Sequence, residues 1–205
     1  YFVMTETGPF ILTLYEKRVN ADDLPFFLGL MEHLAERGVP CPTPIRDRNG
    51  VALKTLNGRP ATLISFMTGV SPRRVTVDQC SEVGRSLADL HLKGADFAIK
   101  RPNALSLEGW PALAHGCAKR ADEVEPGLAR ELETEIAAME QGWPGDLPAG
   151  VIHADLFCDN VFFDSGRLSG IIDFYFACND LFAYDVAICL NAWCFESAKE
   201  FNVTK

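Results

Sequence analysis

The segment VIHADLFCDNVFF, residues 151–163, holds the polar residues whose types and spacing could support chemistry. His153, Asp155 and Asn160 lie within eight residues, between apolar runs that are expected to bury the segment. Burial of a carboxylate costs free energy unless a cation, a hydrogen-bond donor or a chemical role compensates for it. The segment therefore predicts a functional site.

The residues that follow predict a β-hairpin that brings two oxygen ligands together. Residues 161–163 can pair antiparallel with residues 168–172, in a register that places Asn160 near Ile171. Asp173 then lies on the same face as Ile171 and diagonal to Asn160, because side chains alternate along a strand. An amide oxygen and a carboxylate suit Mg²⁺, which keeps several waters and is completed by nucleotide phosphates.

Asp155 lies in the loop before this hairpin, 18 residues before Asp173 (173 − 155 = 18), and is placed to accept a proton from a hydroxyl nucleophile. This is the catalytic arrangement of protein-kinase-like phosphotransferases, with the base and one metal ligand on one loop and the other ligand at the DFG position, here DFY. In the alternative interpretation, Asp155 caps a helix and Asp173 ends a strand. Agreement between three positions and a hairpin favours the catalytic interpretation.

Longer stretches resemble one family of this superfamily, the homoserine kinases of proteobacteria, which are members of the aminoglycoside phosphotransferase and choline kinase superfamily. The resemblance covers essentially the whole chain and rests on IHADLFCDN, IIDFYFACND, AYDVAICLNAWCFE, GPFILTLYEKRV, DLPFFLGLMEHL and WPGDLPAGVIHADL. The short motif identifies the superfamily, whereas the choice of homoserine rests on the longer stretches. The resemblance implies ATP-dependent phosphorylation of the L-homoserine hydroxyl, on the route to threonine, with ATP and Mg²⁺ bound.

The resemblance also implies roles for individual residues. Asp155 matches the catalytic base, and Asn160 and Asp173 match the Mg²⁺ ligands. The connector between the lobes, whose backbone would bond adenine, matches Ser65, Phe66 and Met67.

Two further residues match positions of structural support. Asp185 in AYDVA matches a position that orients the catalytic loop. His153 is interpreted as an internal brace rather than a proton shuttle, because its loop position suits hydrogen bonding to nearby backbone.

The chain departs from the superfamily at the cation that usually holds the nucleotide phosphates. The aligned strand position is Thr13 rather than Lys or Arg, and Lys17 is the candidate replacement, although a solvated strand end is the alternative. Glu32 is the nearest candidate for the helix acid that would pair with the cation, with an exposed polar helix face as its alternative. Phosphate neutralisation is therefore expected to depend more on Mg²⁺.

The loop at residues 173–180 borders the predicted reaction centre and offers candidates for substrate binding. Asn179 or Asp180 could accept from an α-ammonium group, and Tyr175 could form a wall of the pocket. A capped loop before the next helix explains these residues equally well. An α-carboxylate calls for an Arg, which the sequence does not single out.

The first 68 residues predict a small sheet with one helix that would carry the nucleotide. The predicted elements are strands at 1–5 and 10–15, a helix of about a dozen residues from 22, and strands at 51–56 and 60–67. A turn spans residues 6–9, and Asn57 and Gly58 form a two-residue turn.

The remainder predicts mainly helices. Thr76 and Gln79 form a capping box that starts a helix ending at Gly94, and a second helix runs from near Pro126 to Gly142. Residues 97–125 are less regular.

These elements predict an α+β, bilobal protein-kinase-like fold. Residues 1–68 are the N-terminal nucleotide-binding lobe, and residues 69–205 are a mainly helical catalytic lobe that carries the β-hairpin. The phosphate-covering loop and further C-terminal helices of the family are not in the sequence, so we expect a chain truncated at both ends.

Composition excludes several classes of function. The net charge of −9, from 28 acidic and 19 basic residues, argues against nucleic acid or an anionic membrane as partner. Seven cysteines without a C-x-x-C pair indicate neither a disulfide framework nor a zinc site, and predict reduced thiols in a cytoplasmic protein. No membrane span is expected, because polar residues interrupt the apolar C-terminal region.

The function expected from these observations is homoserine kinase, with L-homoserine and ATP as small-molecule substrates. The alternatives are another small-alcohol kinase of the superfamily, acting on choline or an aminoglycoside, and a nucleotide-binding pseudokinase. The joint presence of Asp155, Asn160 and Asp173 argues against the pseudokinase, because binding without transfer needs no base. The sequence leaves the oligomeric state open.

Overall fold

The structure is a computed structural model, and it describes residues 1–16, 19–197 and 200–205 of the chain. The chain forms two compact units. The first combines residues 1–101 with residues 149–205, and the second consists of residues 102–148. The lobe boundary at residue 68 falls inside the first unit and stays a prediction.

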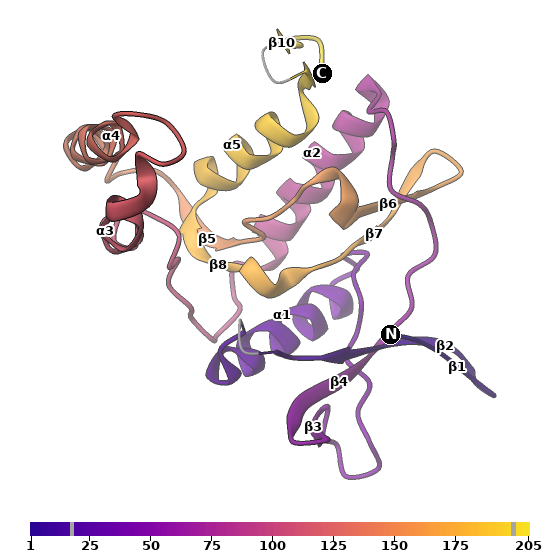
Figure 1. Cartoon of the computed structure of the whole chain (residues 1–205). Coiled ribbons are helices and arrows are strands. Elements are labelled where there is room, and N and C mark those ends of the chain that lie inside the picture. The colour runs from indigo at the N-terminus through magenta and orange to yellow at the C-terminus, as the bar shows by residue number, and fades with distance from the viewer. Residues whose placement is uncertain (17–18, 198–199) are drawn as a thin grey trace. The chain divides into compact units, whose positions relative to one another are not determined.

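A four-stranded antiparallel sheet opens the first unit (Figure 1). Its order is β1-β2-β4-β3, from β1 (Phe2–Thr5), β2 (Gly8–Leu14), β3 (Leu53–Leu56) and β4 (Arg59–Ser65). Asn57 and Gly58 both have positive φ, at 49° and 73°, so the two-residue turn between β3 and β4 is confirmed. The predicted first turn is too long, because Gly8 pairs with Thr5 and belongs to β2.

Helix α1 (Leu24–Glu36) follows a short 3-10 turn at Ala21–Asp23 and provides much of the core. Its buried side chains repeat at helical spacing and include Phe27, Leu30, Met31 and Leu34. The partly buried sheet residue Ile64 packs against this core. The predicted helix of about a dozen residues is confirmed.

The rest of the first unit carries the predicted site. Its main elements are α2 (Val77–Lys93), β5 (Ala149–Ile152), β6 (Val161–Asp164), β7 (Arg167–Ile171), β8 (Cys178–Leu181), α5 (Phe182–Trp193), β9 (Phe195–Ser197) and β10 (Glu200–Phe201), with 3-10 turns at Cys158–Asn160 and Phe174–Phe176. β5 pairs antiparallel with β8, and both α2 and α5 contact β5. The segment expected to be a loop at 173–180 therefore contains a 3-10 turn and most of a strand.

The β6–β7 hairpin is confirmed, but at its end next to Asn160 the register differs from the prediction by one residue. Phe163 pairs with Leu168 as expected, whereas Val161 pairs with Ile171, because the register shifts between Phe162 and Phe163. Such a shift inserts one residue into a ladder and turns the strand. Asn160 consequently lies opposite Ile172, whose N–H donates to its carbonyl oxygen at 2.9 Å.

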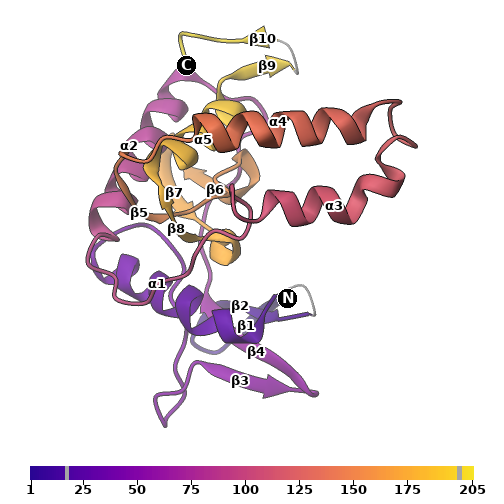
Figure 2. The ribbon, with the colours of Figure 1, turned by 90° about the vertical axis from the view of Figure 1, so that its left-hand side faces the viewer.

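The second unit is a helical hairpin in which α3 (Trp110–Ala121) and α4 (Leu128–Gly142) run side by side (Figure 2). The rings of Trp110 and Trp143 meet edge to face, with centroids 5.4 Å apart. Helix α4 was predicted, but α3 falls in the stretch interpreted as irregular. The sequence of α3, WPALAHGCAKRA, has Gly116 within the helix, and Gly disfavours a helix interior.

Two predictions from composition concern membrane spans and the cysteines. Within the described ranges, no helix is long and apolar enough to cross a membrane. All seven cysteines have free thiols.

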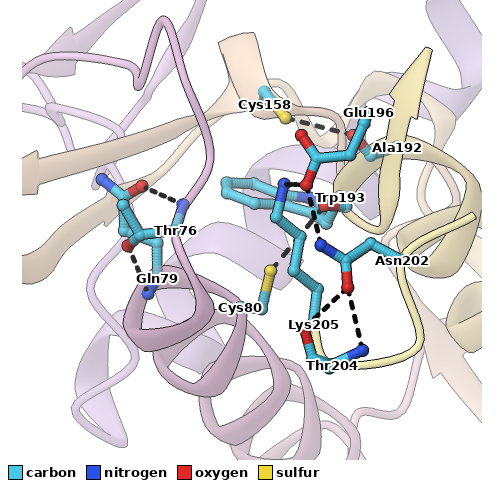
Figure 3. Close-up of polar contacts among 10 residues, drawn as sticks. All are labelled: Thr76, Gln79, Cys80, Cys158, Ala192, Trp193, Glu196, Asn202, Thr204 and Lys205. Atoms are coloured by element: carbon cyan, nitrogen blue, oxygen red, sulfur yellow. Dashed lines mark hydrogen bonds and ion pairs between the residues drawn. The ribbon is translucent and has the colours of Figure 1, made fainter.

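The capping box at the start of α2 forms as predicted (Figure 3). The Thr76 hydroxyl accepts from the N–H of Gln79 at 3.3 Å, and Gln79 Oε1 accepts from the N–H of Thr76 at 3.1 Å. Two N-terminal donors of the helix are thereby satisfied.

We expect Thr76→Ala to lower the free energy of unfolding by about 1 kcal/mol, because it removes the cap acceptor. Denaturant unfolding of the full-length protein measures this. Ser81→Ala, at an exposed position of the same helix, is the control and should change the value by less than about 0.5 kcal/mol. Equal effects of the two substitutions would contradict a stabilising cap.

Candidate active site

The loop that follows β5 is attached to α5 through one buried carboxylate. Asp185, in the first turn of α5, has no exposed surface. Its Oδ2 atom accepts from the backbone N–H of His153 and its Oδ1 atom from that of Ala154, both at 2.9 Å. His91 Nε2 lies 2.9 Å from Oδ2 and supplies a third donor. Three donors compensate for the burial of the carboxylate.

His153 is fully buried and contacts the segment that carries Asp173. Its Nε2 atom lies 3.0 Å from the carbonyl oxygen of Ile172. A carbonyl only accepts, so Nε2 carries the proton, and Nδ1 has no partner among the described residues. Burial lowers the pKa of His153, although the nearby Asp185 acts in the opposite direction. The ring is therefore neutral at pH 7 and braces the loop.

Asp155 and Asn160 contact each other across the same loop. The amide nitrogen of Asn160 donates to the backbone carbonyl of Asp155 at 2.8 Å and to its Oδ2 atom at 2.9 Å. These two bonds use the amide nitrogen of Asn160 and leave its side-chain carbonyl oxygen as a possible acceptor or metal ligand. Burial raises the pKa of Asp155, and the neighbouring Asp173 carboxylate raises it further, whereas the bond from Asn160 lowers it.

Asp173 lies beyond the end of β7. The alternation of side chains along a strand, from which we placed it on the same face as Ile171, therefore does not apply to it. Its backbone is left-handed, with φ 64° and ψ 62°, because the chain turns there into the 3-10 segment Phe174–Phe176. Among the described residues, none forms a hydrogen bond or ion pair with its carboxylate. Asp173 nevertheless lies near Asp155, as the effect on the Asp155 pKa requires.

A cavity of about 310 Å³ lies between the sheet and the hairpin within the first unit. Three of its lining residues are the predicted adenine connector, Ser65, Phe66 and Met67. Thr13, Asp173 and Tyr175 line the same cavity. The structure thus brings the connector, one predicted metal ligand and Tyr175 to one cavity.

A sequence profile of the phosphotransferase enzyme family matches residues 1–205, the whole chain. The chain belongs to the phosphotransferase enzyme family. It is 60% identical over its whole length to the homoserine kinase of Rhodospirillum rubrum and 61% identical to that of Rhizobium meliloti, and it spans 64% and 63% of their lengths. The solved structure of the amicoumacin kinase hAmiN in complex with AMP-PNP, Ca²⁺ and Ami is 16% identical, with a TM-score of 0.72 over 94% of this chain and 60% of that one.

The likeness to hAmiN confirms the predicted kinase-like fold. The resemblance to homoserine kinases noted in the sequence is confirmed by the two curated relatives.

The loop of this phosphotransferase has a second attachment to α5 that sequence reasoning missed. The indole N–H of Trp193 donates to the carbonyl of Leu156 at 2.8 Å. The thiol of Cys158 donates to the carbonyl of Ala192 at 3.3 Å (Figure 3). Trp193 follows Asp185 by eight residues (193 − 185 = 8), a spacing that keeps both on one helix face and could have identified it.

The cation that would hold nucleotide phosphates was assigned to Lys17, which lies outside the described residues. The described residues that line the cavity include no Lys or Arg. The candidate helix acid, Glu32, instead binds the Arg46 guanidinium through two contacts, at 2.6 and 2.7 Å. Its carboxylate is therefore occupied by a cation outside the set of cavity-lining residues.

The predicted substrate residues of this phosphotransferase fall in two places. Tyr175 lines the cavity, whereas Asn179 and Asp180 lie on β8. Asn179 Oδ1 accepts from the N–H of Arg101 at 2.9 Å, and Asp180 Oδ1 accepts from the N–H of Leu181 at 2.7 Å. A substrate-binding role for all three stays a prediction.

We expect Asp185→Asn to lower the free energy of unfolding by about 3 kcal/mol, because the new amide places a donor against one of two buried backbone donors. Asp159→Asn, which changes an exposed aspartate of the same loop, is the matched control and should have little effect. Denaturant unfolding of both variants measures the difference. A loss below about 1 kcal/mol for Asp185→Asn would mean that the carboxylate does not hold the loop.

A second prediction concerns pH. The folded-state pKa of His153 lies below its unfolded value of about 6.5, so acid favours the unfolded state by up to about 1.4 kcal/mol per pH unit below pH 6.5. His153→Gln keeps a donor near Ile172 and removes this titration. The stability advantage of the unsubstituted protein over the variant should therefore shrink between pH 6.5 and 5.5, as followed by urea unfolding. A constant difference would contradict a neutral buried imidazole.

Proposed function

We propose that the protein containing this chain is a homoserine kinase, which transfers the γ-phosphoryl group of ATP to the side-chain hydroxyl of L-homoserine in threonine biosynthesis. The observation that carries the proposal is the identity of 60 and 61% to curated homoserine kinases over the whole chain. The Asp155–Asn160 contact and the nearby Asp173 supply the chemical groups that such a transfer needs.

In this proposal Asp155 accepts the proton of the acceptor hydroxyl. Its raised pKa makes it a stronger base than an ordinary aspartate, and the hydrogen bond from Asn160 fixes one carboxylate oxygen. A positioned base of this kind contributes about 10²- to 10⁴-fold to rate. Asp185 and Trp193 hold the loop so that the base needs little rearrangement.

The donor set fits Mg²⁺. The Asn160 carbonyl oxygen and the Asp173 carboxylate are hard oxygen ligands, and no group of three or more His, Cys, Asp or Glu that could hold a metal occurs in the described part of the chain. Mg²⁺ commonly takes one or two protein oxygens and completes its shell with water and phosphate. When bound, it would neutralise charge on the phosphates, which the cavity offers no described Lys or Arg to do.

Adenine would occupy the end of the cavity formed by Ser65, Phe66 and Met67. Ser65 is fixed there, because its hydroxyl accepts from the N–H of Thr43 at 2.9 Å. Gly170 leaves room for Met67: a Cβ atom at Gly170 would lie 3.2 Å from that side chain. The connector is thus fixed at Ser65 by a hydrogen bond, and Met67 packs against the backbone of Gly170.

The acceptor is tested by a coupled ADP-release assay of the full-length protein with homoserine, choline, serine and an aminoglycoside at saturating MgATP. We expect homoserine to give the highest kcat/KM. Faster turnover of choline or an aminoglycoside would replace the proposed substrate, and absence of turnover with all four would favour a nucleotide-binding pseudokinase.

Asp155→Asn should reduce kcat about 10²- to 10⁴-fold with MgATP affinity nearly unchanged, because the variant keeps size and hydrogen bonding but loses the proton acceptor. Activity, calorimetric nucleotide binding and melting temperature are measured on one preparation. Asp164→Asn, at the exposed end of the hairpin, is the control. A variant that loses melting temperature and nucleotide affinity together would indicate a structural aspartate, and an unchanged kcat would remove the base assignment.

A further inference from the structure

Two tyrosines that are 160 residues apart share a hydrogen bond beside the cavity. The hydroxyls of Tyr15, which directly follows β2, and Tyr175, in the 3-10 segment after Asp173, are 3.0 Å apart. Their rings meet edge to face, with centroids 5.3 Å apart. Burial raises the pKa of both hydroxyls, so each is neutral and one donates to the other. Neither tyrosine is therefore suited to act as a base.

Tyr175 has further contacts with the sheet and with α1. Thr13 of β2 lines the same cavity as Tyr175, and the ring of Phe27 meets the Tyr175 ring edge to face at 5.6 Å. The guanidinium of Arg101 lies 5.0 Å above the Phe27 ring. Tyr15 itself is 4% exposed, and its N–H donates to the carbonyl of Pro60 at 2.9 Å. The ring and hydroxyl of Tyr175 thus have fixed neighbours on two elements.

Asp173 lies two residues before Tyr175, in a backbone conformation that only surrounding contacts can maintain. A left-handed backbone at a residue other than Gly is strained, and it persists where the surrounding packing holds it. On one side of the turn, the buried Phe174 ring contacts the His153 ring at 4.8 Å. On the other side, Tyr175 contacts Tyr15. The two consecutive aromatic residues fix the turn that aims the Asp173 carboxylate.

We propose that Tyr175 is a positioning residue, and that its hydrogen bond to Tyr15 holds Asp173 in place for the magnesium ion of the bound nucleotide. Thr13, on β2, lines the same cavity as Tyr175 and Asp173, and the described lining holds no Lys or Arg. A neutral hydroxyl contact then links the strand to the metal-binding turn. This inference rests on the proposed function for the identity of the metal and nucleotide, but not for the identity of the acceptor.

The test uses Tyr15→Phe and Tyr175→Phe, which each remove one oxygen and keep the ring contacts. The affinity of the full-length protein for AMP-PNP is measured by calorimetry with and without Mg²⁺ and without any acceptor. We expect each variant to weaken the Mg²⁺-dependent affinity about 5- to 20-fold, because a partly buried hydroxyl is left unpaired and the turn loosens. Affinity without Mg²⁺ should change less than about twofold.

The double variant should bind no more weakly than the weaker single variant, because both substitutions remove the same bond. Asp173→Ala removes the proposed metal ligand itself. Its AMP-PNP affinity shows how much is lost when Mg²⁺ no longer strengthens binding. Ser81→Ala, which removes one exposed side-chain hydroxyl from α2, is the control and should leave both affinities unchanged.

Three results would overturn the proposal: additive losses in the double variant, unchanged Mg²⁺ dependence in both single variants, or equal losses with and without Mg²⁺ that accompany a fall in melting temperature. If the double variant does not fold, Tyr15→Phe alone decides, since Tyr15 does not adjoin Asp173 in sequence. A failure of the proposed function is recognised separately: the unsubstituted protein would then show no homoserine turnover, whereas the tyrosine effect on Mg²⁺-dependent binding would persist.

Discussion

The buried carboxylate of Asp185 is the interaction on which the site depends. A loop such as 153–160 cannot satisfy its backbone donors through a ladder, and unsatisfied buried N–H groups are costly. Asp185 accepts from two of them and from His91, and its place in the first turn of α5 is favourable for a negative charge. The loop therefore takes its position from a helix that follows it in sequence by about thirty residues.

Tertiary contacts also hold the two strained backbone positions of the site. Ala154 and Asp173 both have left-handed backbones, with φ 61° and 64°, and neither is Gly. Asp185 binds the N–H of Ala154, while His153 and Phe174 pack together beside Asp173. These contacts let two carboxylates, Asp155 and Asp173, approach closely enough to raise a pKa. Two neighbouring carboxylates repel each other, and a cation bound between them would remove this repulsion.

The charges around the cavity that holds the connector and Asp173 also favour a bound cation. Its described lining has one carboxylate and neither Lys nor Arg, and Arg46 and Arg101, which lie outside that lining, pair with Glu32 and Asp23. A phosphate group placed there would rely on a metal ion and on neutral donors. The Tyr15–Tyr175 contact fits such an arrangement, because hydroxyls can fix geometry without adding charge.

The amino-acid sequence by itself determined the features that depend on neighbours along the chain. The Asn57–Gly58 turn, the Thr76–Gln79 capping box and the β6–β7 hairpin follow from local hydrogen bonds and backbone preferences, so their residues identify them. The motif of Asp155, Asn160 and Asp173 is equally readable, since it consists of short spacings. Only the tertiary structure decided the shifted register at Asn160, the left-handed turn at Asp173, the pairing of β5 with β8, and the contact of Tyr15 with Tyr175. Each of these is a balance between strain or loop closure and packing against residues far away in the sequence, and such packing energies exist only once the chain has folded.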